Sequence, residues 1–399
     1  MTNFSVRPRY VWARRSARAA GWATLLLGMA ACSDDPRSTE DASAEDPNED
    51  SSASLAQQGR DLLEAHRARQ EFPGAVMALH DPARGDALVT SGAARPTPEG
   101  EPVDPDVPWG IGSITKTFVA VVVLQLAEEG TLDLDASVEA YFPELPRASE
   151  ITVRQLLQHT SGLNEYLASP AVLADAARPW SPAELVDAAV ALGPVSEPGA
   201  EHHYANTNYI LLGELVAALD GQPWHEAVRA RIQEPLGMQH TGYIGQPSAL
   251  PMGPGYGLEE GQFVDYTTRL DPSLGGAAGG LESTASDLMR FGRALIDGRL
   301  LDEPSWTQMR AFVPAEPYDY VSHEYGLGFE KYTANELAVY GHLGTSAAHT
   351  AFFGFDPESG AVAAVLINAR NSPPPALMTF EALGALAGKD VGPPAAPAP

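Results

Sequence analysis

A long apolar segment in the first third of the chain, PWGIGSITKTFVAVVVLQLAEEG (residues 108–130), constrains the fold more than any other part of the sequence. From Ser113 to Leu126 its residues are apolar almost all round, which predicts a helix buried inside the protein rather than lying on its surface. Pro108 interrupts the chain before this helix, and Gly130 supplies a stop signal after it. The rest of the chain must therefore pack around this helix on every side.

Two reactive side chains lie near the start of this predicted helix. Residues i and i+3 share a helix face, so Lys116 is expected one turn away from the Ser113 hydroxyl. A serine needs a base to become a nucleophile, and a lysine desolvated in a pocket can lose its proton and serve as that base. Arginine cannot do so. Of the 25 Lys and Arg residues only three are lysines, at positions 116, 331 and 389, so a lysine kept in a buried helix indicates chemistry.

Strand patterns at both ends of the chain bracket a helical middle. Residues 74–80 and 86–92 predict a hairpin, and three more strands are predicted over 336–342, 347–355 and 361–369. Helices are predicted over 55–70, 152–163, 181–193, about 207–221, 222–237, 283–298 and about 374–387, with a loop at GGAAGG (275–280). We therefore expect an α+β fold (an α/β sandwich). One antiparallel sheet is built from both ends of the chain and flanked by helices, with an all-helical subdomain inserted at about 117–245.

The N-terminal residues predict export and a lipid anchor. Five arginines between positions 7 and 18 precede an apolar run over 19–31, which is too short to span a bilayer. Cys32, the only cysteine, follows directly, as in a bacterial lipoprotein signal. We expect a signal peptide over 1–31, lipidation of Cys32 and a membrane-anchored, extracytoplasmic protein in the periplasm or at the cell surface. The alternative is an ordinary secretory signal with an unrelated cysteine.

The remaining boundaries follow from composition. Residues 32–54 are acidic and carry no large apolar side chain after the cysteine, which predicts a disordered tether. A single folded domain is expected over 55–390, followed by a Pro/Ala tail over 391–399.

The charge balance and the missing motifs exclude several function classes. The chain has 52 Asp and Glu against 25 Lys and Arg, a formal charge of −27, which argues against nucleic acid as a partner. GGAAGG lacks the Lys-Ser/Thr of a phosphate-binding loop, and no His or Cys group has convincing metal-ligand spacing. No cofactor and no metal are therefore expected. The absence of a Gly-x-Ser-x-Gly elbow argues against an α/β-hydrolase.

Two later segments supply candidate partners for Ser113. Tyr204 and Asn206 lie in a polar loop that leads into a helix, where a tyrosine can relay a proton and an asparagine can hold the lysine or a substrate amide. Gly341-His342-Leu343-Gly344-Thr345 lies at the end of a predicted strand. Its histidine could share protons or bind substrate, its second glycine would allow close approach, and the Thr345 N–H could donate to an oxyanion beside that of Ser113.

This order of motifs resembles the serine β-lactamase and penicillin-binding-protein superfamily. The shared features are Ser-x-x-Lys on a buried helix, then Tyr-x-Asn, then a basic residue-x-Gly on a strand. Tyr-x-Asn resembles the class C branch with its DD-peptidase, D-aminopeptidase and family VIII esterase relatives. The flanking LLQHTSGL, YANTNYILLGELV and GHLGTSAAHTAFFGFDPESG also agree, and the resemblance runs from about residue 57 to 388. One departure is His342-Leu343-Gly344 in place of Lys-Thr-Gly, as in certain DD-carboxypeptidases and many esterase-like members. Leu343 also lacks the hydroxyl that would help to bind a carboxylate.

The resemblance implies acyl transfer through a covalent acyl-enzyme, without a cofactor. By this resemblance, Ser113 attacks a carbonyl, and Lys116 and Tyr204 transfer its proton, without a decision on which of the two is the base. Asn206, His342 and Gly344 orient the substrate. The N–H groups of Ser113 and Thr345 hold the oxyanion. The implied activity is that of a DD-carboxypeptidase-like hydrolase of D-alanyl peptides. A family VIII-type carboxylesterase, a β-lactamase and a non-catalytic penicillin-binding sensor are the alternatives. The implied partners are a peptide or small-molecule substrate and, through Cys32, a membrane.

Overall fold

The computed structural model describes residues 47–69, 72–97, 100–246, 251–316, 322–334, 336–370 and 375–389. The predicted signal peptide, the lipidation site Cys32, most of the predicted tether and the predicted tail lie outside the described residues. Among the helices described, none has the length and apolar character needed to cross a membrane.

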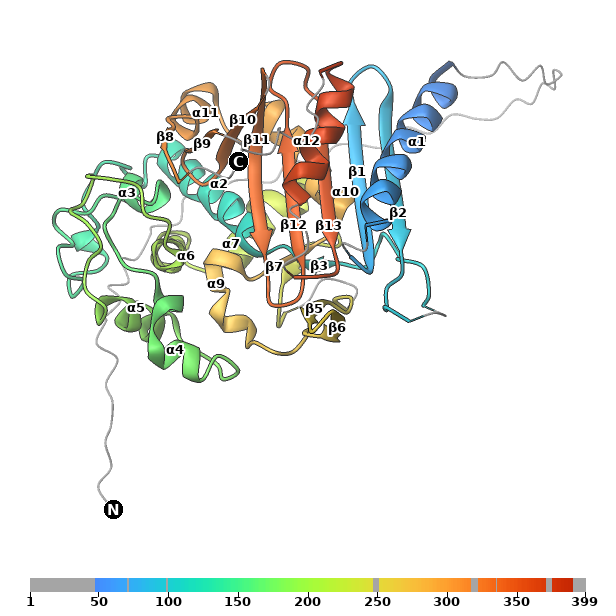
Figure 1. Ribbon diagram of the computed structural model, residues 1–399. Helices are drawn as coiled ribbons and strands as arrows, with labels where there is room; N and C mark the ends of the chain where they lie inside the picture. The colour runs from blue at the N-terminus through green and yellow to red at the C-terminus, as the bar shows by residue number, and fades with distance from the viewer. Residues whose placement is uncertain are drawn as a thin grey trace, which may run out of the picture.

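An antiparallel sheet of eight strands, in the order β2-β1-β13-β12-β11-β10-β9-β8, forms the centre of the fold (Figure 1). The strands are β1 (Gly74–Asp81), β2 (Gly85–Gly92), β8 (Val313–Pro314), β9 (Ser322–Tyr325), β10 (Glu330–Ala334), β11 (Leu337–Thr345), β12 (Thr350–Phe355) and β13 (Val362–Ile367). The two ends of the chain meet where β1 pairs with β13, with Ala75 opposite Ile367. The expected α+β fold and the antiparallel sheet built from both ends of the chain are therefore confirmed.

Helices cover both faces of this sheet and give it two cores. The helices α1 (Pro47–Arg67) and α12 (Pro375–Leu386) lie on one face, and α2 (Thr115–Glu128) and α10 (Ala285–Ile296) lie on the other (Figure 1). Successive side chains of β13 alternate between the two cores. Val365 and Ile367 pack in the core on the side of α1 and α12, while Ala364 and Leu366 pack in the core on the side of α2 and α10. A strand buried on both faces has a continuous apolar sequence, as β13 does.

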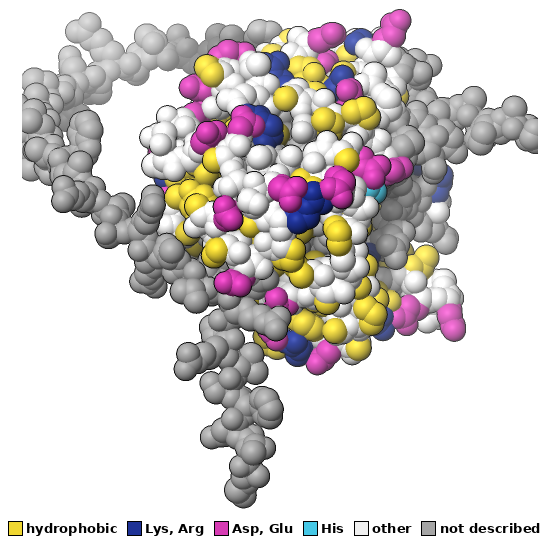
Figure 2. All heavy atoms as spheres, turned by 90° about the vertical axis from the view of Figure 1, so that its left-hand side faces the viewer, with side chains coloured by type: hydrophobic (Ala, Val, Ile, Leu, Met, Phe, Trp, Pro, Cys, Tyr) yellow, Lys and Arg dark blue, Asp and Glu magenta, His cyan; other side chains and the backbone are white. Residues whose placement is uncertain are grey.

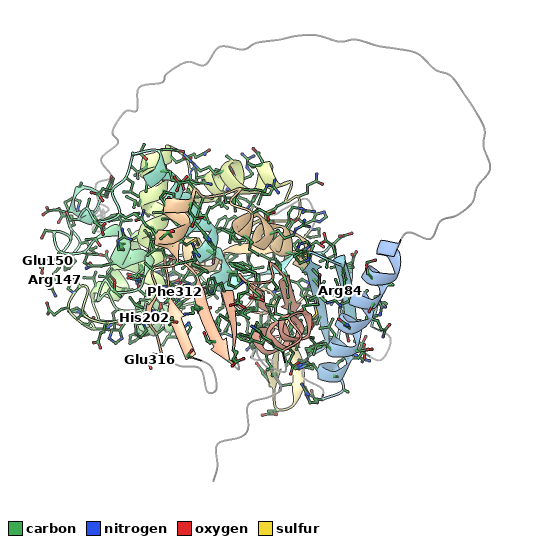
Figure 3. All side chains as sticks on the ribbon, turned by 90° about the horizontal axis from the view of Figure 1, so that it is seen from above. Arg84, Arg147, Glu150, His202, Phe312 and Glu316 are labelled. Carbon is green, nitrogen blue, oxygen red and sulfur yellow. The ribbon has the colours of Figure 1, made fainter. Side chains whose placement is uncertain are left out.

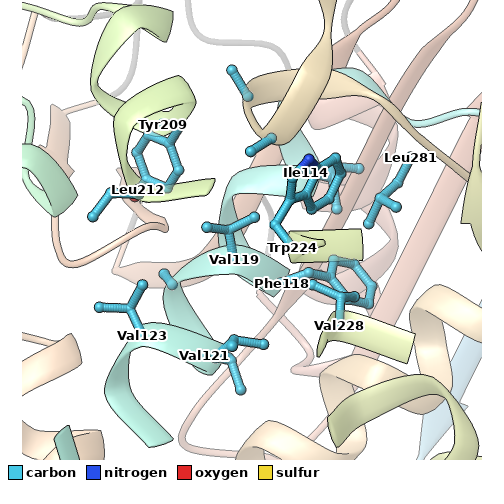
Figure 4. Close-up of a cluster of buried hydrophobic side chains, with 14 of the residues drawn as sticks. Ile114, Phe118, Val119, Val121, Val123, Tyr209, Leu212, Trp224, Val228 and Leu281 are labelled. Carbon is cyan, nitrogen blue, oxygen red and sulfur yellow. The ribbon is translucent and has the colours of Figure 1, made fainter. Parts of the chain in front are cut away.

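The helix α2 is buried as the sequence predicts. Its residues from Thr115 to Leu124 are all buried, Lys116 included. Figure 4 shows its apolar side chains between Tyr209 and Leu212 on one side and Trp224 and Val228 on the other. The phenyl ring of Phe118 also stacks on that of Phe291, with 4.0 Å between the ring centroids.

Between the two strand-forming ends, the chain is mostly helical. These elements are η2 (Val138–Ala140), α3 (Val153–Leu157), η3 (Tyr166–Ala168), α4 (Pro170–Ala174), α5 (Pro182–Val190), α6 (Asn206–Asp220), α7 (Trp224–Val228), the π-helical turn η4 (Arg229–Gln233) and α8 (Glu234–Leu236). The surface at this end of the molecule mixes acidic, basic and scattered apolar side chains (Figure 2). The ion pair of Arg147 with Glu150 lies here, at the opposite end from Arg84 beside the β1–β2 turn (Figure 3).

Smaller elements join the helical part to the sheet. A three-stranded sheet contains β3 (Trp109–Gly110), β7 (Leu281–Ser283) and β4 (Gly242–Tyr243), and β5 (Tyr256–Glu259) pairs with β6 (Gln262–Asp265). The remaining elements are η1 (Gly112–Ile114), η5 (Pro272–Leu274), α9 (Gly276–Gly279) and α11 (Glu303–Met309).

Several boundaries differ from those predicted. Helix α1 already begins at Pro47, inside the predicted tether, where a proline in the first turn and the acids that follow favour a helix start. Leu55, which is fully buried, anchors this part of the helix. The glycines of GGAAGG form the short helix α9 rather than a loop, because α9 packs against α2 and α6. The strands β3 to β10 were not predicted.

Candidate active site

Ser113 and Lys116 meet at the junction of η1 and α2, as the spacing predicts. Ser113 lies in the 3-10 turn η1 and Lys116 in the first turn of α2. The Lys116 Nζ lies 2.9 Å from the Ser113 Oγ. It also donates to the Asn206 Oδ1 and to the Ala278 carbonyl oxygen, each at 2.7 Å. The structure therefore brings together three of the predicted site residues, Ser113, Lys116 and Asn206.

The environment of Lys116 prepares it to exchange a proton. Burial lowers the pKa of Lys116 to about 7, although the carboxylates of Glu165 and Glu330 oppose this effect. A charged ammonium group has three N–H bonds and finds three acceptors here. A neutral amine has two N–H bonds and one lone pair, so it can keep its bonds to Asn206 and Ala278 and accept the hydroxyl proton of Ser113. Near neutral pH, Lys116 can therefore accept the proton of Ser113 while the hydroxyl oxygen attacks a carbonyl carbon.

Glu165 fixes the orientation of Asn206, and the sequence did not identify it. The Asn206 backbone N and side-chain Nδ2 both donate to the Glu165 Oε2, at 2.7 and 2.9 Å. With Nδ2 held in this way, the Oδ1 must face Lys116. Glu165 follows the His159–Leu163 turn that had already suggested the family, but no spacing in the sequence showed that it contacts Asn206.

Tyr204 lies beside the amine and is held by a histidine. Its ring centroid lies 4.8 Å from the Lys116 Nζ, and the ring stacks on His159 at a centroid distance of 4.2 Å. The His159 Nδ1 accepts from the Ala205 backbone N–H at 3.1 Å, and the His159 backbone has a positive φ of 58°. Such a conformation is costly for a side-chain-bearing residue and often occurs at functional sites. The structure thus brings Tyr204 to the site that the sequence predicted.

His342 lies behind the cavity rather than in its wall. Its side chain is 1% exposed, and it is absent from the residues that line the cavity at Ser113. The Nδ1 donates to the Leu343 carbonyl oxygen at 2.6 Å, and the Nε2 lies 3.0 Å from the Tyr325 hydroxyl. Burial lowers the pKa of His342, although Glu330 opposes this. In this arrangement the imidazole contacts Tyr325 instead of the space where a substrate would bind.

Two glycines allow the end of β11 to approach the serine turn. A Cβ at Gly344 would lie 1.8 Å from the Ile111 carbonyl oxygen, and a Cβ at Gly112 would lie 2.5 Å from the Thr345 backbone N. Gly112 also has a positive φ of 50°. As a result, Ser113 and Thr345, the two predicted oxyanion donors, line the same cavity.

This cavity has a volume of about 170 Å³ and lies where the helical part meets the sheet. Its apolar side chains include Ile244, Met252, Leu270 and Leu274. Arg370, just after β13, is the only lysine or arginine among the described residues that line it. The Arg370 side chain forms no ion pair with any residue that the structure describes. No motif in the sequence pointed to this arginine.

Within the described part of the chain, no group of three or more His, Cys, Asp or Glu residues is arranged to hold a metal ion. The site geometry rests instead on the serine, the amine and their hydrogen-bond partners.

Comparison with known proteins places this geometry among related enzymes. The family described as Beta-lactamase matches residues 60–387. A D-stereospecific amidohydrolase from Streptomyces sp. is 34% identical, with a TM-score of 0.72 over 82% of this chain and 98% of that chain. A D-amino acid amidase from Ochrobactrum anthropi SV3 in complex with D-phenylalanine is 30% identical, with a TM-score of 0.74 over 84% and 96%. PbpX of Bacillus subtilis (strain 168), named as a penicillin-binding protein, is 31% identical over 55% of this chain, which spans only about half (52%) of that relative.

Proposed function

Because the chain belongs to the beta-lactamase family and is a serine hydrolase of that fold, we propose that it hydrolyses the amide bond that follows a D-amino acid, as in a D-alanyl peptide. The observation that carries this proposal is the hydrogen-bonded group of Ser113, Lys116 and Asn206 at a small cavity. Two similar solved structures are named as a D-stereospecific amidohydrolase and a D-amino acid amidase, and the match to this chain covers 98% and 96% of their lengths.

The proposed reaction proceeds through an acyl-enzyme. Neutral Lys116, with Tyr204 beside it, takes the proton of Ser113 as the Oγ attacks the substrate carbonyl carbon. The N–H groups of Ser113 and Thr345 stabilise the oxyanion. The C–N bond then breaks, and the proton passes from Lys116 or Tyr204 to the leaving nitrogen. Water attacks the ester on Ser113 in the second half of the reaction, which releases the acid and restores the hydroxyl.

Arg370 supports a substrate whose leaving group carries a carboxylate. A guanidinium group binds a carboxylate through paired hydrogen bonds, and Arg370 lines the cavity together with Ser113. Leu343 lacks the hydroxyl that helps to bind this carboxylate in relatives with Lys-Thr-Gly, and Arg370 offers a cation in its place. The small cavity with apolar walls suits a short side chain such as that of alanine.

A matched set of peptides tests both parts of this proposal. We expect acetyl-D-Ala-D-Ala to be cleaved with higher kcat/KM than acetyl-L-Ala-L-Ala. Arg370→Gln should lower kcat/KM for acetyl-D-Ala-D-Ala by about 10- to 100-fold, the value of a charged hydrogen bond. It should change hydrolysis of acetyl-D-Ala-D-alaninamide by less than about threefold, because that substrate has no carboxylate.

Arg269→Gln is the control for this set, because Arg269 is exposed and paired with Glu259 at 2.7 Å. Equal loss on both D-peptides would remove Arg370 from carboxylate recognition. Cleavage of p-nitrophenyl esters but of no peptide would favour the carboxylesterase alternative. Consumption of penicillin without a lasting adduct, measured by intact mass, would favour a β-lactamase.

We further propose that the mature protein is extracytoplasmic and anchored in a membrane through lipid on Cys32. Support comes from the sequence of residues 1–32 alone. Labelled palmitate should enter the wild-type protein but not Cys32→Ala. A wild-type protein that takes up no label would show that the cysteine is not lipidated.

A further inference from the structure

A buried carboxylate that the proposed reaction does not use lies behind the cavity. Glu330, the first residue of β10, is 3% exposed. A buried charge is costly unless it is paired and hydrogen-bonded. Its Oε2 accepts from the Leu343 backbone N–H at 2.9 Å and from the Tyr332 hydroxyl, and it lies 3.6 Å from the His342 Nδ1. Its Oε1 lies 3.5 Å from the His323 Nε2.

The hydrogen bond from the Leu343 N–H to Glu330 takes the place of a backbone hydrogen bond to β10. β10 pairs with β11 only from Ala334 opposite Leu337 to Glu330 opposite Gly341, so β11 continues beyond the end of β10. The Leu343 N–H lies in this overhanging part and finds the Glu330 side chain in place of a backbone carbonyl. Thr345, two residues further along, lines the catalytic cavity. This part of β11 stays paired with β12 as far as Thr345 opposite Thr350, and Glu330 holds it on its other side.

Contacts also lead from Glu330 toward the amine. The His342 Nε2 lies 3.0 Å from the Tyr325 hydroxyl. The Tyr325 ring contacts that of His159 at a centroid distance of 4.8 Å, and His159 in turn stacks on Tyr204. Lys116 lies over the Tyr204 ring. The carboxylate and the amine thus belong to one cluster of contacting side chains.

The charges around Lys116 come from several elements. The groups that act on it or neighbour it are Glu165 at the N-cap of η3, Glu330 of β10, His342 of β11, Tyr325 of β9, Tyr209 of α6, His159 in the turn after α3 and Tyr204 in the loop before α6. Burial lowers the pKa of both His159 and His342, so these imidazoles are neutral at pH 7. The acids are therefore the groups that oppose the desolvation of Lys116.

We propose that Glu330 is a positioning residue that holds His342 and the overhanging end of β11 in place and supplies a fixed negative charge behind Lys116. It does not touch the substrate. Its charge favours the protonated amine, so together with Glu165 it raises the pH above which the site becomes active. This role concerns the serine hydrolase site itself and does not depend on which acyl donor the enzyme uses.

Glu330→Gln tests the charge while keeping an acceptor for the Leu343 N–H. Because the chain has only three lysines, at positions 116, 331 and 389, ¹³C-lysine labelling of the full-length protein gives few signals, and Lys116 titrates near neutral pH. We expect the pKa of Lys116 to fall by about one unit in Glu330→Gln, since an anion that favoured the charged form has been removed. The acidic limb of kcat/KM for p-nitrophenyl acetate should move to lower pH by the same amount.

Two further variants separate charge from geometry. Glu324→Gln on β9 is the matched control, because Glu324 pairs with Lys331 at 2.6 Å and should leave the Lys116 titration unchanged. Glu330→Asp keeps the charge but shortens the side chain, so we expect a wild-type Lys116 titration with a lower kcat. An unchanged Lys116 titration in folded Glu330→Gln would overturn the proposal. A shift of equal size in Glu324→Gln or Glu330→Asp would overturn it as well.

Discussion

Replacing Ser113 by alanine is expected to lower kcat/KM for every accepted ester or amide by about 10⁴-fold or more. The reason is that the Ser113 Oγ lies 2.9 Å from the Lys116 Nζ and faces the cavity. Without this oxygen no acyl-enzyme can form, and only direct attack by water remains. Hydrolysis of p-nitrophenyl acetate measures the rate, and intact mass after treatment with a fluorophosphonate measures covalent labelling.

The fold should survive this substitution, because alanine fits the 3-10 turn η1 and Ser113 is only partly buried. A thermal melt within a few degrees of wild type would confirm this. Ser359→Ala is a suitable control, since that serine bonds to Asp356 in the β12–β13 turn, away from the cavity. Retention of more than a tenth of the activity, or fluorophosphonate labelling of Ser113→Ala, would show that another residue is the nucleophile.

Local patterns predicted the central strands, which are buried on both sides, and also the edge strand β2. The five predicted strands are consecutive in the sheet, from β2 to β11. The largely apolar runs of β1, β12 and β13 reflect burial against two helical layers, whereas β2 alternates between buried and more exposed residues. The capped helix α5 also lies where Ser181, Pro182 and Glu184 predicted it. In each case, residues close together in the sequence are enough to predict the element.

The strands that were missed depend on distant contacts. The strand β8 has two residues and lies at the edge of the sheet, and β9, next to it, has four. β8 is too short to show an alternating pattern, and Ser322, His323 and Glu324 of β9 are polar or charged, which hides any alternation there. Glycines formed the helix α9 because packing against α2 and α6 overrode their low helix propensity.

The difference between local patterns and distant contacts also applies to the candidate active site. Ser113, Lys116, Tyr204 and Asn206 could be selected because motif order and a buried helix point to them. Glu165 and Glu330 could not, since each acts through a contact with a residue far away or across a strand. Arg370 was missed for a similar reason, because only the folded chain brings it to the cavity that contains Ser113. The sequence thus predicted the serine, the lysine and two of their neighbours, Tyr204 and Asn206, but not the acids and the arginine that long-range contacts bring near them.

Lys116→Arg is expected to lower kcat/KM by about 10³-fold while keeping a positive charge at the site. Arginine has hydrogen-bond donors for Asn206 and Ala278, but it cannot lose a proton in a protein and so cannot accept one from Ser113. In wild type, kcat/KM should fall about tenfold per pH unit below the pKa of Lys116, which lies at about 7. The pH profile of p-nitrophenyl acetate hydrolysis measures both effects.

Lys116→Met separates loss of the base from loss of stability. The pKa of this lysine falls from 10.5 in the unfolded chain to about 7 in the folded protein, so between these values the unfolded state binds more protons. Its contribution to stability therefore increases as pH rises from 7 to 10.5 and is most unfavourable below 7. Methionine removes the buried amine, so the variant should be inactive yet melt no lower than wild type at pH 6. If Lys116→Arg kept most of the activity with an unchanged acidic limb, Tyr204 would have to be the base, and Lys116 would only hold it and Asn206 in place.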